Sequence, residues 1–298
     1  MRGMPAAPPD PGISLEVLLR QGIAALGVHS PSPGLDAELL LQYATGLPRS
    51  TFRSSPERRV AAGQSERFRS LIDRRQLGEP VAYLLGTQDF WTLTLAVTPA
   101  VLIPRPETEL VVERALTHLP SASPASVLDL ATGSGAIALA IASERPQAHV
   151  VATDLSAAAL QVAGDNASTL GLNQVEFRGG HWYDPVGPAR FAVITSNPPY
   201  IAAGDPDLDP AVLAHEPTIA LLADSDGFAA LIEIIAGAPA HLEPGGWLIL
   251  EHGWQQALKV RNLLEQAGFS HVRSHADLAG HERVTEGQWP GFEGDRGE

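Results

Sequence analysis

The spacing of hydrophobic residues along the chain changes near residue 86. From residue 14 to residue 86, apolar side chains recur three and four positions apart, for example from Leu15 to Ile23. This spacing is typical of amphipathic helices. Glycine and proline at the breaks, such as Gly34 and Pro48, indicate where one helix ends and the next begins. We therefore predict a small helical domain over residues 14–86.

Beyond residue 106, short apolar segments alternate with helical ones. The predicted strands cover residues 126–130, 150–153, 175–177, 191–195 and 247–251, and the predicted helices cover residues 136–143, 157–169, 228–235 and 256–267. Strands that alternate with helices predict a parallel sheet covered on both faces. We therefore expect an α/β domain with a doubly wound, mostly parallel sheet over residues 107–298, to which residues 271–275 and 283–287 can add edge strands.

Two segments lie outside these domains. Residues 87–106 are interpreted as a hairpin linker, because Phe90 to Val97 alternates with period two and Val101 to Ile103 follows after a short turn. Two prolines then fix an extended link. Residues 1–13 are predicted to form a flexible tail, since they are rich in alanine, proline and glycine and lack the apolar core of a signal peptide.

The composition favours a soluble protein without stable nucleic-acid binding. With 44% hydrophobic residues, the 298-residue chain can fill a large core and a smaller one. Its net charge of -14 argues against tight binding to a phosphate backbone. The absence of cysteine excludes disulfides and thiolate metal sites and fits a cytoplasmic protein. No apolar stretch reaches the roughly 20 residues that span a bilayer, so we expect no membrane association.

Residues 49–75 depart from the acidic balance of the chain. They contain eight arginines against three acidic residues. Such a run is either a solvated helix face or a docking face for an acidic protein or RNA.

A glycine-rich turn follows the first predicted strand of the α/β domain. It places Gly133 and Gly135 at the carboxyl end of the strand, where open α/β sheets bind ligands. Glycine lets the backbone turn sharply and a ligand approach closely. Asp154 ends the next strand, where a carboxylate can accept both hydroxyls of a ribose. The loop and the carboxylate together predict a nucleoside cofactor.

The loop by itself leaves two nucleoside cofactors open. It also satisfies the dinucleotide fingerprint, so a nucleotide-dependent oxidoreductase is one alternative. Asp129 favours S-adenosylmethionine, because its carboxylate would repel a pyrophosphate but could help to hold the ammonium of a methionine moiety. A downstream motif at Asn197 suits methyl transfer and has no hydride-transfer counterpart. Ordinary helix capping is the structural alternative for Asp129 and Asp154.

That motif consists of Asn197, Pro198, Pro199 and Tyr200. The Asn197 side-chain oxygen and the Pro198 carbonyl can accept hydrogen bonds from both N–H groups of a planar amide or amino nitrogen. Tyr200 can cover the planar group and face a sulfonium with its ring. The prolines keep these acceptors preorganised. Alignment for in-line displacement can then supply most of the catalysis, with no base needed before the methyl moves.

The clamp predicts methylation of an amide or amino nitrogen. An adenine-N6 or other nucleic-acid amino-methyltransferase is an alternative, and a purely structural Pro-Pro turn is another. Trp182 either packs beside an adenine or belongs to the core. His271 and His275 lie four residues apart in a predicted strand, so we expect solvated histidines and no metal site.

Several segments of the chain together resemble one known family. They are Asp36-Ala-Glu-Leu-Leu, Gly78-Glu-Pro-Val-Ala-Tyr-Leu-Leu-Gly86, Val101-Leu-Ile-Pro-Arg-Pro-Glu-Thr-Glu109, the glycine-rich loop, Ser196-Asn-Pro-Pro-Tyr-Ile201, Glu216-Pro217, Leu250-Glu-His-Gly253 and residues 280–284. From about residue 14 to 290 the chain resembles the HemK/PrmC family, the N5-glutamine methyltransferases of peptide chain release factors. The Arg-Pro-Glu-Thr-Glu segment is more discriminating than Asn-Pro-Pro-Tyr, which adenine methyltransferases share.

The resemblance implies a Rossmann-like S-adenosylmethionine-dependent methyltransferase domain and a helical domain that docks the release factor. The methyl group would go to the glutamine of the Gly-Gly-Gln loop of class I release factors, leaving S-adenosylhomocysteine. The residues implied to contact the cofactor are Ala131, Thr132, Gly133, Ser134, Gly135, Asp154, Trp182 and Asn197. Those implied to hold the glutamine are Asn197, Pro198, Pro199 and Tyr200.

Ala131 departs from the family pattern, which usually has glycine there. The departure argues against a need for a positive φ at position 131. It indicates that the essential close approaches lie at Gly133 and Gly135.

Overall fold

The computed structural model describes residues 12–122, 124–206 and 208–290. Most of the predicted tail, residues 1–11, lies outside this range. The chain divides between Gly86 and Thr87 into two compact units, which are described separately below. None of the described helices combines the length and the apolar character that crossing a bilayer would require.

The N-terminal unit is helical, as the sequence predicts. Its helices are α1 (Leu15–Leu26), α2 (Pro33–Thr45), α3 (Arg49–Ser54), α4 (Ala62–Gln76) and α5 (Val81–Leu85). Leu18, Leu40 and Phe68 are among the fully buried side chains of its core. Ile13, which we placed in the tail, belongs to strand β1 (Ile13–Ser14), and it pairs with Val60 of β2 (Arg59–Val60).

Part of the arginine-rich run stabilises this unit from within. Arg75 donates from Nε to the Asp36 carboxylate over 2.8 Å, and both side chains are largely buried. Ser30 and Ser32 also donate their hydroxyls to Asp36, over 2.7 and 3.1 Å. Arg49 pairs with Glu38 in the same way at the surface. These arginines are therefore occupied by intramolecular partners.

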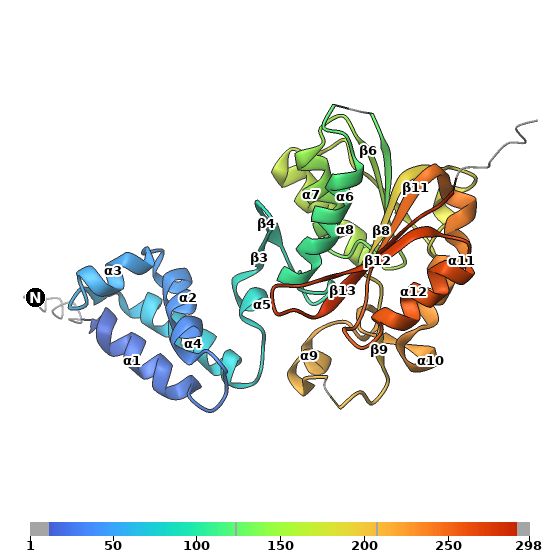
Figure 1. Cartoon of the computed structure of the whole chain (residues 1–298). Helices are drawn as coiled ribbons and strands as arrows, with labels where there is room; N and C mark the ends of the chain where they lie inside the picture. Colours follow the sequence, from blue (N-terminus) through green and yellow to red (C-terminus); the bar gives the residue numbers. More distant parts are fainter. Residues whose placement is uncertain (1–11, 123, 207, 291–298) are drawn as a thin grey trace, which may run out of the picture. The chain divides into compact units, whose positions relative to one another are not determined.

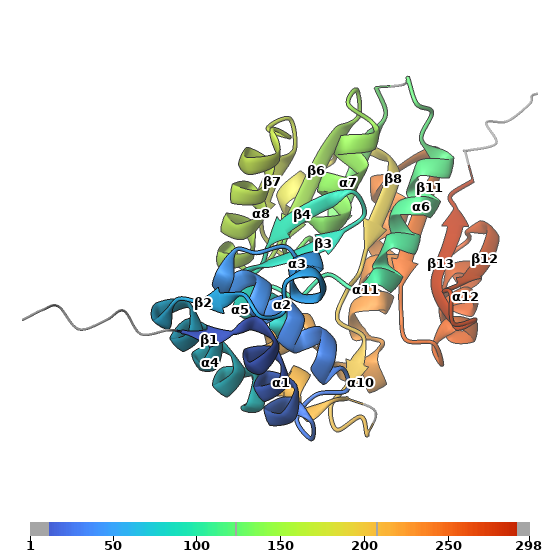
Figure 2. The ribbon, with the colours of Figure 1, turned by 90° about the vertical axis from the view of Figure 1, so that its left-hand side faces the viewer.

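A seven-stranded sheet forms the centre of the C-terminal unit. In spatial order its strands are β12 (Ser270–Ala276), β13 (Glu282–Gln288), β11 (Leu242–Glu251), β8 (Phe191–Ser196), β5 (Ser126–Leu130), β6 (His149–Asp154) and β7 (Glu176–Gly179). Figure 2 shows this succession of strands across the sheet. Only β13 runs antiparallel to its neighbours, β11 and β12. The predicted doubly wound, mostly parallel sheet is confirmed.

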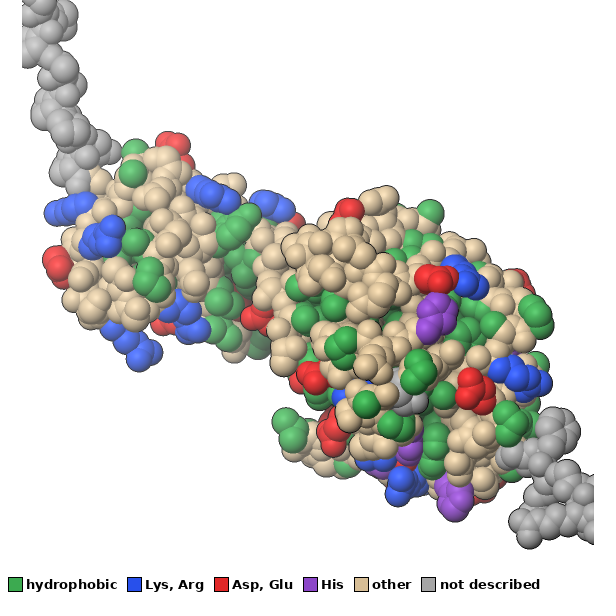
Figure 3. Space-filling model, turned by 90° about the horizontal axis from the view of Figure 1, so that it is seen from above, with side chains coloured by type: hydrophobic (Ala, Val, Ile, Leu, Met, Phe, Trp, Pro, Cys, Tyr) green, Lys and Arg blue, Asp and Glu red, His purple; other side chains and the backbone are tan. Residues whose placement is uncertain are grey.

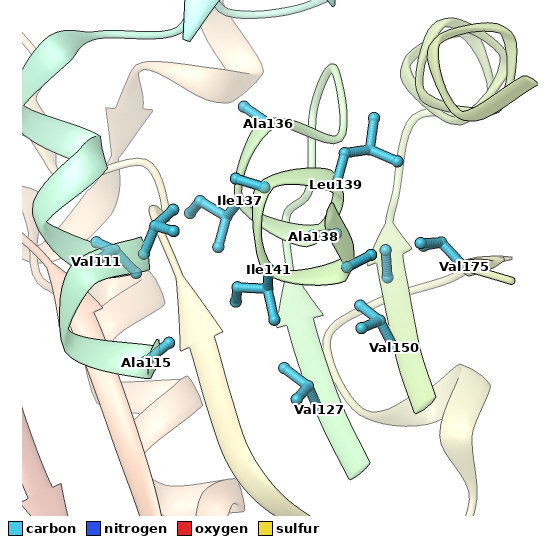
Figure 4. Packing of buried hydrophobic residues seen from close by; sticks show 14 of the residues in the cluster. Val111, Ala115, Val127, Ala136, Ile137, Ala138, Leu139, Ile141, Val150 and Val175 are labelled. Carbon is cyan, nitrogen blue, oxygen red and sulfur yellow. The ribbon is translucent and has the colours of Figure 1, made fainter. Parts of the chain in front are cut away.

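Helices cover both faces of the sheet (Figure 1). On one face lie α6 (Glu109–His118), α7 (Ala136–Glu144) and α8 (Ala157–Leu170), and on the other α11 (Ala229–His241) and α12 (Ala257–Gln266). The strand residues alternate accordingly, because successive side chains of a strand point to opposite faces. Val127 packs below α7 (Figure 4), whereas Leu128 belongs to the cluster around α11.

Short elements complete the unit. They are the 3-10 turns η1 (Pro106–Thr108), η2 (Asp184–Val186) and η3 (Thr218–Ala220), the strands β9 (Ile201–Ala202) and β10 (Leu222–Ala223), the helix α9 (Pro210–His215) and the helical turn α10 (Asp224–Gly227). Strands β9 and β10 pair in parallel directly after the predicted clamp.

The hairpin exists, but its predicted turn is wrong. Strands β3 (Thr87–Phe90) and β4 (Leu93–Ala96) pair across a turn at Trp91, while residues 101–103 form no strand. Trp91 has a φ of 56°, and its backbone N–H donates to Glu109 over 2.7 Å. This long-range contact stabilises a turn that the local alternation of apolar and polar residues does not predict. The hairpin belongs to the C-terminal unit and is held to its α8, since Asn166 exchanges hydrogen bonds with both backbone groups of Ala96.

Candidate active site

The glycine-rich loop begins directly after β5 with three residues in the left-handed region. Ala131, Gly133 and Gly135 have φ values of 56°, 57° and 84°. The expectation that position 131 needs no positive φ is therefore wrong. Alanine tolerates this conformation at a cost of about 1–2 kcal/mol, because its Cβ approaches the following carbonyl oxygen. The glycine that the family usually has at this position was the signal for a positive φ, which the turn between strand and helix imposes on Ala131 as well.

The two glycines of the loop have different roles. A Cβ on Gly135 would lie 3.0 Å from Leu139 and 3.3 Å from Ala163, so this glycine lets the loop pack closely against α7 and α8. A Cβ on Gly133 would meet no protein atom within 4 Å, because this residue borders an open cavity. The space at Gly133 is thus available to a ligand.

Asp154 lies at the end of β6, facing the same cavity. Its two carboxylate oxygens accept hydrogen bonds from the backbone N–H groups of Gly133 and Ser156, over 2.9 and 2.8 Å. Burial raises the pKa of Asp154, against the effect of these backbone donors. Each oxygen keeps a further lone pair, so the fixed carboxylate can still accept two hydroxyl groups.

This cavity has a volume of about 300 Å³. Ala131, Thr132, Gly133, Ser134, Asp154, Trp182, Asn197 and Pro199 are among the residues that line it. The Trp182 indole Nε1 is buried without a hydrogen-bond partner among the described residues. An unpaired buried donor, a backbone cradle and a fixed carboxylate together fit a nucleoside with a polar tail.

Asp129 does not line the cavity. It is fully buried behind the loop, where its carboxylate accepts hydrogen bonds from Thr132 (2.6 Å) and Thr195 (2.9 Å). Burial raises the pKa of Asp129 to about 7. The contacts of Asp129 are thus with the loop and with β8, and they join the ends of two neighbouring strands.

The predicted clamp follows β8, next to the cofactor loop. Leu130 of β5 and Ser196 of β8 are register partners, and the chain reverses its direction of winding between these two strands. Ligands of open α/β sheets bind at such a switch point. Asn197 lines both the first cavity and a second one of about 890 Å³. Tyr200 lines only the second cavity and Pro199 only the first. Pro198, between Asn197 and Pro199 in the chain, is buried.

A hydrogen bond to Thr108 fixes the orientation of the Asn197 side chain. Its Nδ2 donates to the hydroxyl oxygen of Thr108 over 3.1 Å. Since Nδ2 is occupied in this way, the amide presents its Oδ1 acceptor to other groups. Thr108 lies in the Arg-Pro-Glu-Thr-Glu segment, at a position to which we assigned no chemistry from the sequence.

Two further residues of that segment brace the site. Arg105 pairs with the buried carboxylate of Glu216, which also accepts the backbone N–H of Ile103 over 3.0 Å. Glu109 holds the turn of the β3–β4 hairpin, as described above. Below the clamp, the Tyr200 hydroxyl donates to Glu251 over 3.2 Å. Thr108, Glu216 and Glu251 are site residues that sequence reasoning named only as parts of motifs.

Comparison with known proteins identifies the family of this chain. Residues 17–86 match the PrmC N-terminal domain, and residues 110–215 match the methyltransferase small domain. A release factor glutamine methyltransferase of Xylella fastidiosa is 53% identical over 258 residues, which cover 87% of this chain and 94% of the relative. This chain belongs to the release factor glutamine methyltransferase family. Another relative of that name, from Escherichia coli, is 42% identical over 91% of this chain and 97% of its own length.

Solved structures agree on the fold. A 16S rRNA N2 G1207 methyltransferase from Thermus thermophilus, in complex with AdoMet and guanosine, aligns with a TM-score of 0.51 at 22% identity, over 68% of this chain and 49% of its own. A methyltransferase from Pyrococcus furiosus aligns with a TM-score of 0.50 at 18% identity, over 66% of this chain and 89% of its own. The family's α/β domain is thus a methyltransferase fold.

Proposed function

We propose that this protein transfers a methyl group from S-adenosylmethionine to the side-chain amide nitrogen of the glutamine in the Gly-Gly-Gln loop of class I release factors. The observation that carries the proposal is the position of Asn197. Its amide lies in the wall common to two cavities, with Nδ2 tied to Thr108 and Oδ1 free to accept. A methyl donor in the first cavity and a methyl acceptor in the second would meet at this residue.

The first cavity is the proposed cofactor site. Ala131, Thr132, Gly133 and Ser134 would hold the cofactor through their backbone, with Gly135 allowing the turn. Asp154 would accept the ribose hydroxyls, and Trp182 would lie against the base. When bound, S-adenosylmethionine supplies an electrophilic methyl group on a sulfonium. The buried Asp129 would act by fixing Thr132 and not by touching the cofactor.

The clamp residues would prepare the glutamine amide for attack. A carboxamide nitrogen is a poor nucleophile because its lone pair is delocalised. The Asn197 Oδ1 and the Pro198 carbonyl would accept its two N–H groups, which fixes the nitrogen and favours its pyramidal form. Tyr200, on the side of the second cavity, would cover the planar group. Alignment contributes most of the rate, because the reacting groups are held in one geometry.

The helical N-terminal unit is the proposed docking domain for the release factor. Its match to the PrmC N-terminal domain supports this role. Arg53, Arg58 and Arg69 are exposed there and form no salt bridge with any described residue. Arginine side chains are spread over this unit in the left-hand part of Figure 3. They suit an acidic protein surface. We assign the reaction to the cytoplasm, where release factors act.

The proposal is tested by incubating the protein with methyl-labelled S-adenosylmethionine and either a release factor or duplex DNA. We expect label on the release factor alone, and on the loop glutamine when its peptides are mapped. A release factor with asparagine in place of that glutamine is the control and should stay unlabelled. Label on DNA would favour the alternative of a nucleic-acid amino-methyltransferase and contradict the proposal.

A further inference from the structure

Glu251 is a buried carboxylate to which the reaction described above gives no role. It is the last residue of β11, and its exposed fraction is 2%. One of its oxygens accepts the Tyr200 hydroxyl over 3.2 Å. Its Oε2 is buried and has no hydrogen-bond partner among the described residues, and the nearby Thr108 hydroxyl acts to lower the pKa of the carboxyl group. A buried charge with so few partners costs stability, so a structural reason for keeping it is missing.

The carboxylate determines the direction of a chain of hydrogen bonds. An ionised carboxylate can only accept, so Tyr200 donates its hydroxyl hydrogen to Glu251, and the hydroxyl of Thr108 can approach Glu251 only as a donor. The oxygen of Thr108 then has lone pairs that face Asn197, and it accepts Nδ2–H over 3.1 Å. This arrangement leaves the Asn197 Oδ1 for the substrate. A protonated Glu251 could instead donate to Thr108, whose hydroxyl would then be free to donate to Oδ1.

We propose that Glu251 is a positioning residue that orients both polar clamp residues, Asn197 through Thr108 and Tyr200 directly. The inference rests on the proposed function, because orientation of the clamp matters only if the clamp holds an amide. Glu251 touches neither cavity, so it would act without contacting substrate or cofactor.

The surroundings of Glu251 keep its ionisation within reach of neutral pH. Burial raises the pKa of Glu251 to about 7, hydrogen bonds from Thr108 and Tyr200 oppose the rise, Arg283 of β13 lowers it and Glu107 of η1 raises it. The neighbouring His252 adds no charge, because burial lowers its pKa to about 4. Activity should therefore increase as the pH rises through about 7 and Glu251 becomes ionised.

Substitution Glu251→Gln separates positioning from a structural role. Glutamine keeps the size of the side chain, but its amide group can donate a hydrogen bond to Thr108. The hydroxyl of Thr108 is then no longer restricted to donating toward position 251. We expect kcat to fall by roughly tenfold or more, as for loss of a preorganised donor or acceptor. KM for the release factor and Kd for S-adenosylmethionine should stay within about twofold, since the residue touches neither ligand.

The melting temperature supplies the readout that a structural role would not give. Because the folded-state pKa of Glu251 is raised above its unfolded value, its ionisation lowers stability as the pH rises between the two. At pH 8 the Glu251→Gln protein should therefore melt at the same temperature as the unchanged protein or higher. The rise of kcat through pH 7 should also disappear in this variant.

Companion variants complete the test. Thr108→Val should lower kcat like Glu251→Gln, the double variant should lose no more than either single one, and Thr108→Ser should keep most of kcat. Glu282→Gln, which alters a half-buried carboxylate of β13 that pairs with Arg261, is the control and should leave kcat unchanged. A Glu251→Gln protein with normal kcat, or one with a lower melting temperature and an unchanged pH profile, would overturn the inference. If the unchanged protein leaves release factor unlabelled, the proposed function itself fails.

Discussion

Ala131 shows how a single residue can carry strain at the centre of a site. Its φ of 56° is in the region that favours glycine. We predict that Ala131→Gly stabilises the protein by about 0.5–1 kcal/mol, because relief of the strain exceeds the added freedom of the unfolded chain. Chemical denaturation measures this change. Ala211→Gly, in the short helix α9, is the control and should lower the free energy of unfolding. A less stable Ala131→Gly protein would show that the alanine methyl contributes packing that outweighs the strain.

Asp154 is the residue on which cofactor affinity should depend most. Its carboxylate is already fixed by two backbone donors, so little ordering is needed when hydroxyls bind. We expect Asp154→Ala to weaken S-adenosylmethionine binding by roughly a hundredfold, since it removes two charge-assisted hydrogen bonds. Calorimetric titration measures the loss. Asp165→Ala, on the outer side of α8, should bind normally. Equal affinities would exclude the proposed role of Asp154.

At the scale of elements, Glu286 joins α6 to the antiparallel edge of the sheet. This fully buried carboxylate of β13 pairs with Arg114 and His118 of α6 and with Arg273 and His275 of β12. Although burial acts to raise it, hydrogen bonds from His118, Arg114 and Arg273, together with the neighbouring His275 imidazole, hold the pKa of Glu286 well below its usual range.

We predict that Glu286→Gln lowers the free energy of unfolding by about 3 kcal/mol at pH 7, because Arg114 loses its buried counter-charge. The folded-state pKa is depressed, so the stabilisation is present above the unfolded pKa of about 4.3 and is lost as the pH falls below it. The difference in the free energy of unfolding between the two proteins should therefore decrease below pH 4. Urea unfolding at pH 7 and below pH 4 measures this difference, with the exposed Glu265→Gln as control. A gap that does not change with pH would indicate lost packing instead of lost charge.

Elements with a local sequence signal could be predicted, whereas features that depend on distant contacts could not. The strand from Ser126 to Leu130 has the predicted bounds, because a continuous apolar run between turn residues is a local signal. The turn of the hairpin at Trp91 was missed, since it depends on Glu109, 18 residues away. Likewise, the Asn197 motif was found from its residue types, whereas Thr108 and Glu251 were not assigned a role. Their part in the site arises only when η1, the end of β8 and β11 come together.

At the scale of the whole molecule, chemistry and docking are assigned to different units. We predict that replacing Arg53, Arg58 and Arg69 together with alanine raises KM for the release factor about tenfold and leaves kcat at saturation unchanged, since these side chains lie outside the unit that contains both cavities. Steady-state kinetics at low and high salt measure this effect, which salt should diminish. Arg178→Ala, in the other unit, should behave like the unchanged protein. An unaltered KM in the triple variant would assign docking to another surface.

The central claim is that the Asn197 amide holds the glutamine nitrogen that receives the methyl group. Mass spectrometry of the release-factor loop peptide, after incubation with the unchanged protein or with Asn197→Ala, tests it most directly. We expect a singly methylated glutamine with the unchanged protein, and at least a hundredfold slower methylation with Asn197→Ala, roughly the effect of removing one preorganised group. Cofactor affinity should be largely retained. Methylation by Asn197→Ala at the original rate, or a modification on any other residue, would contradict the account.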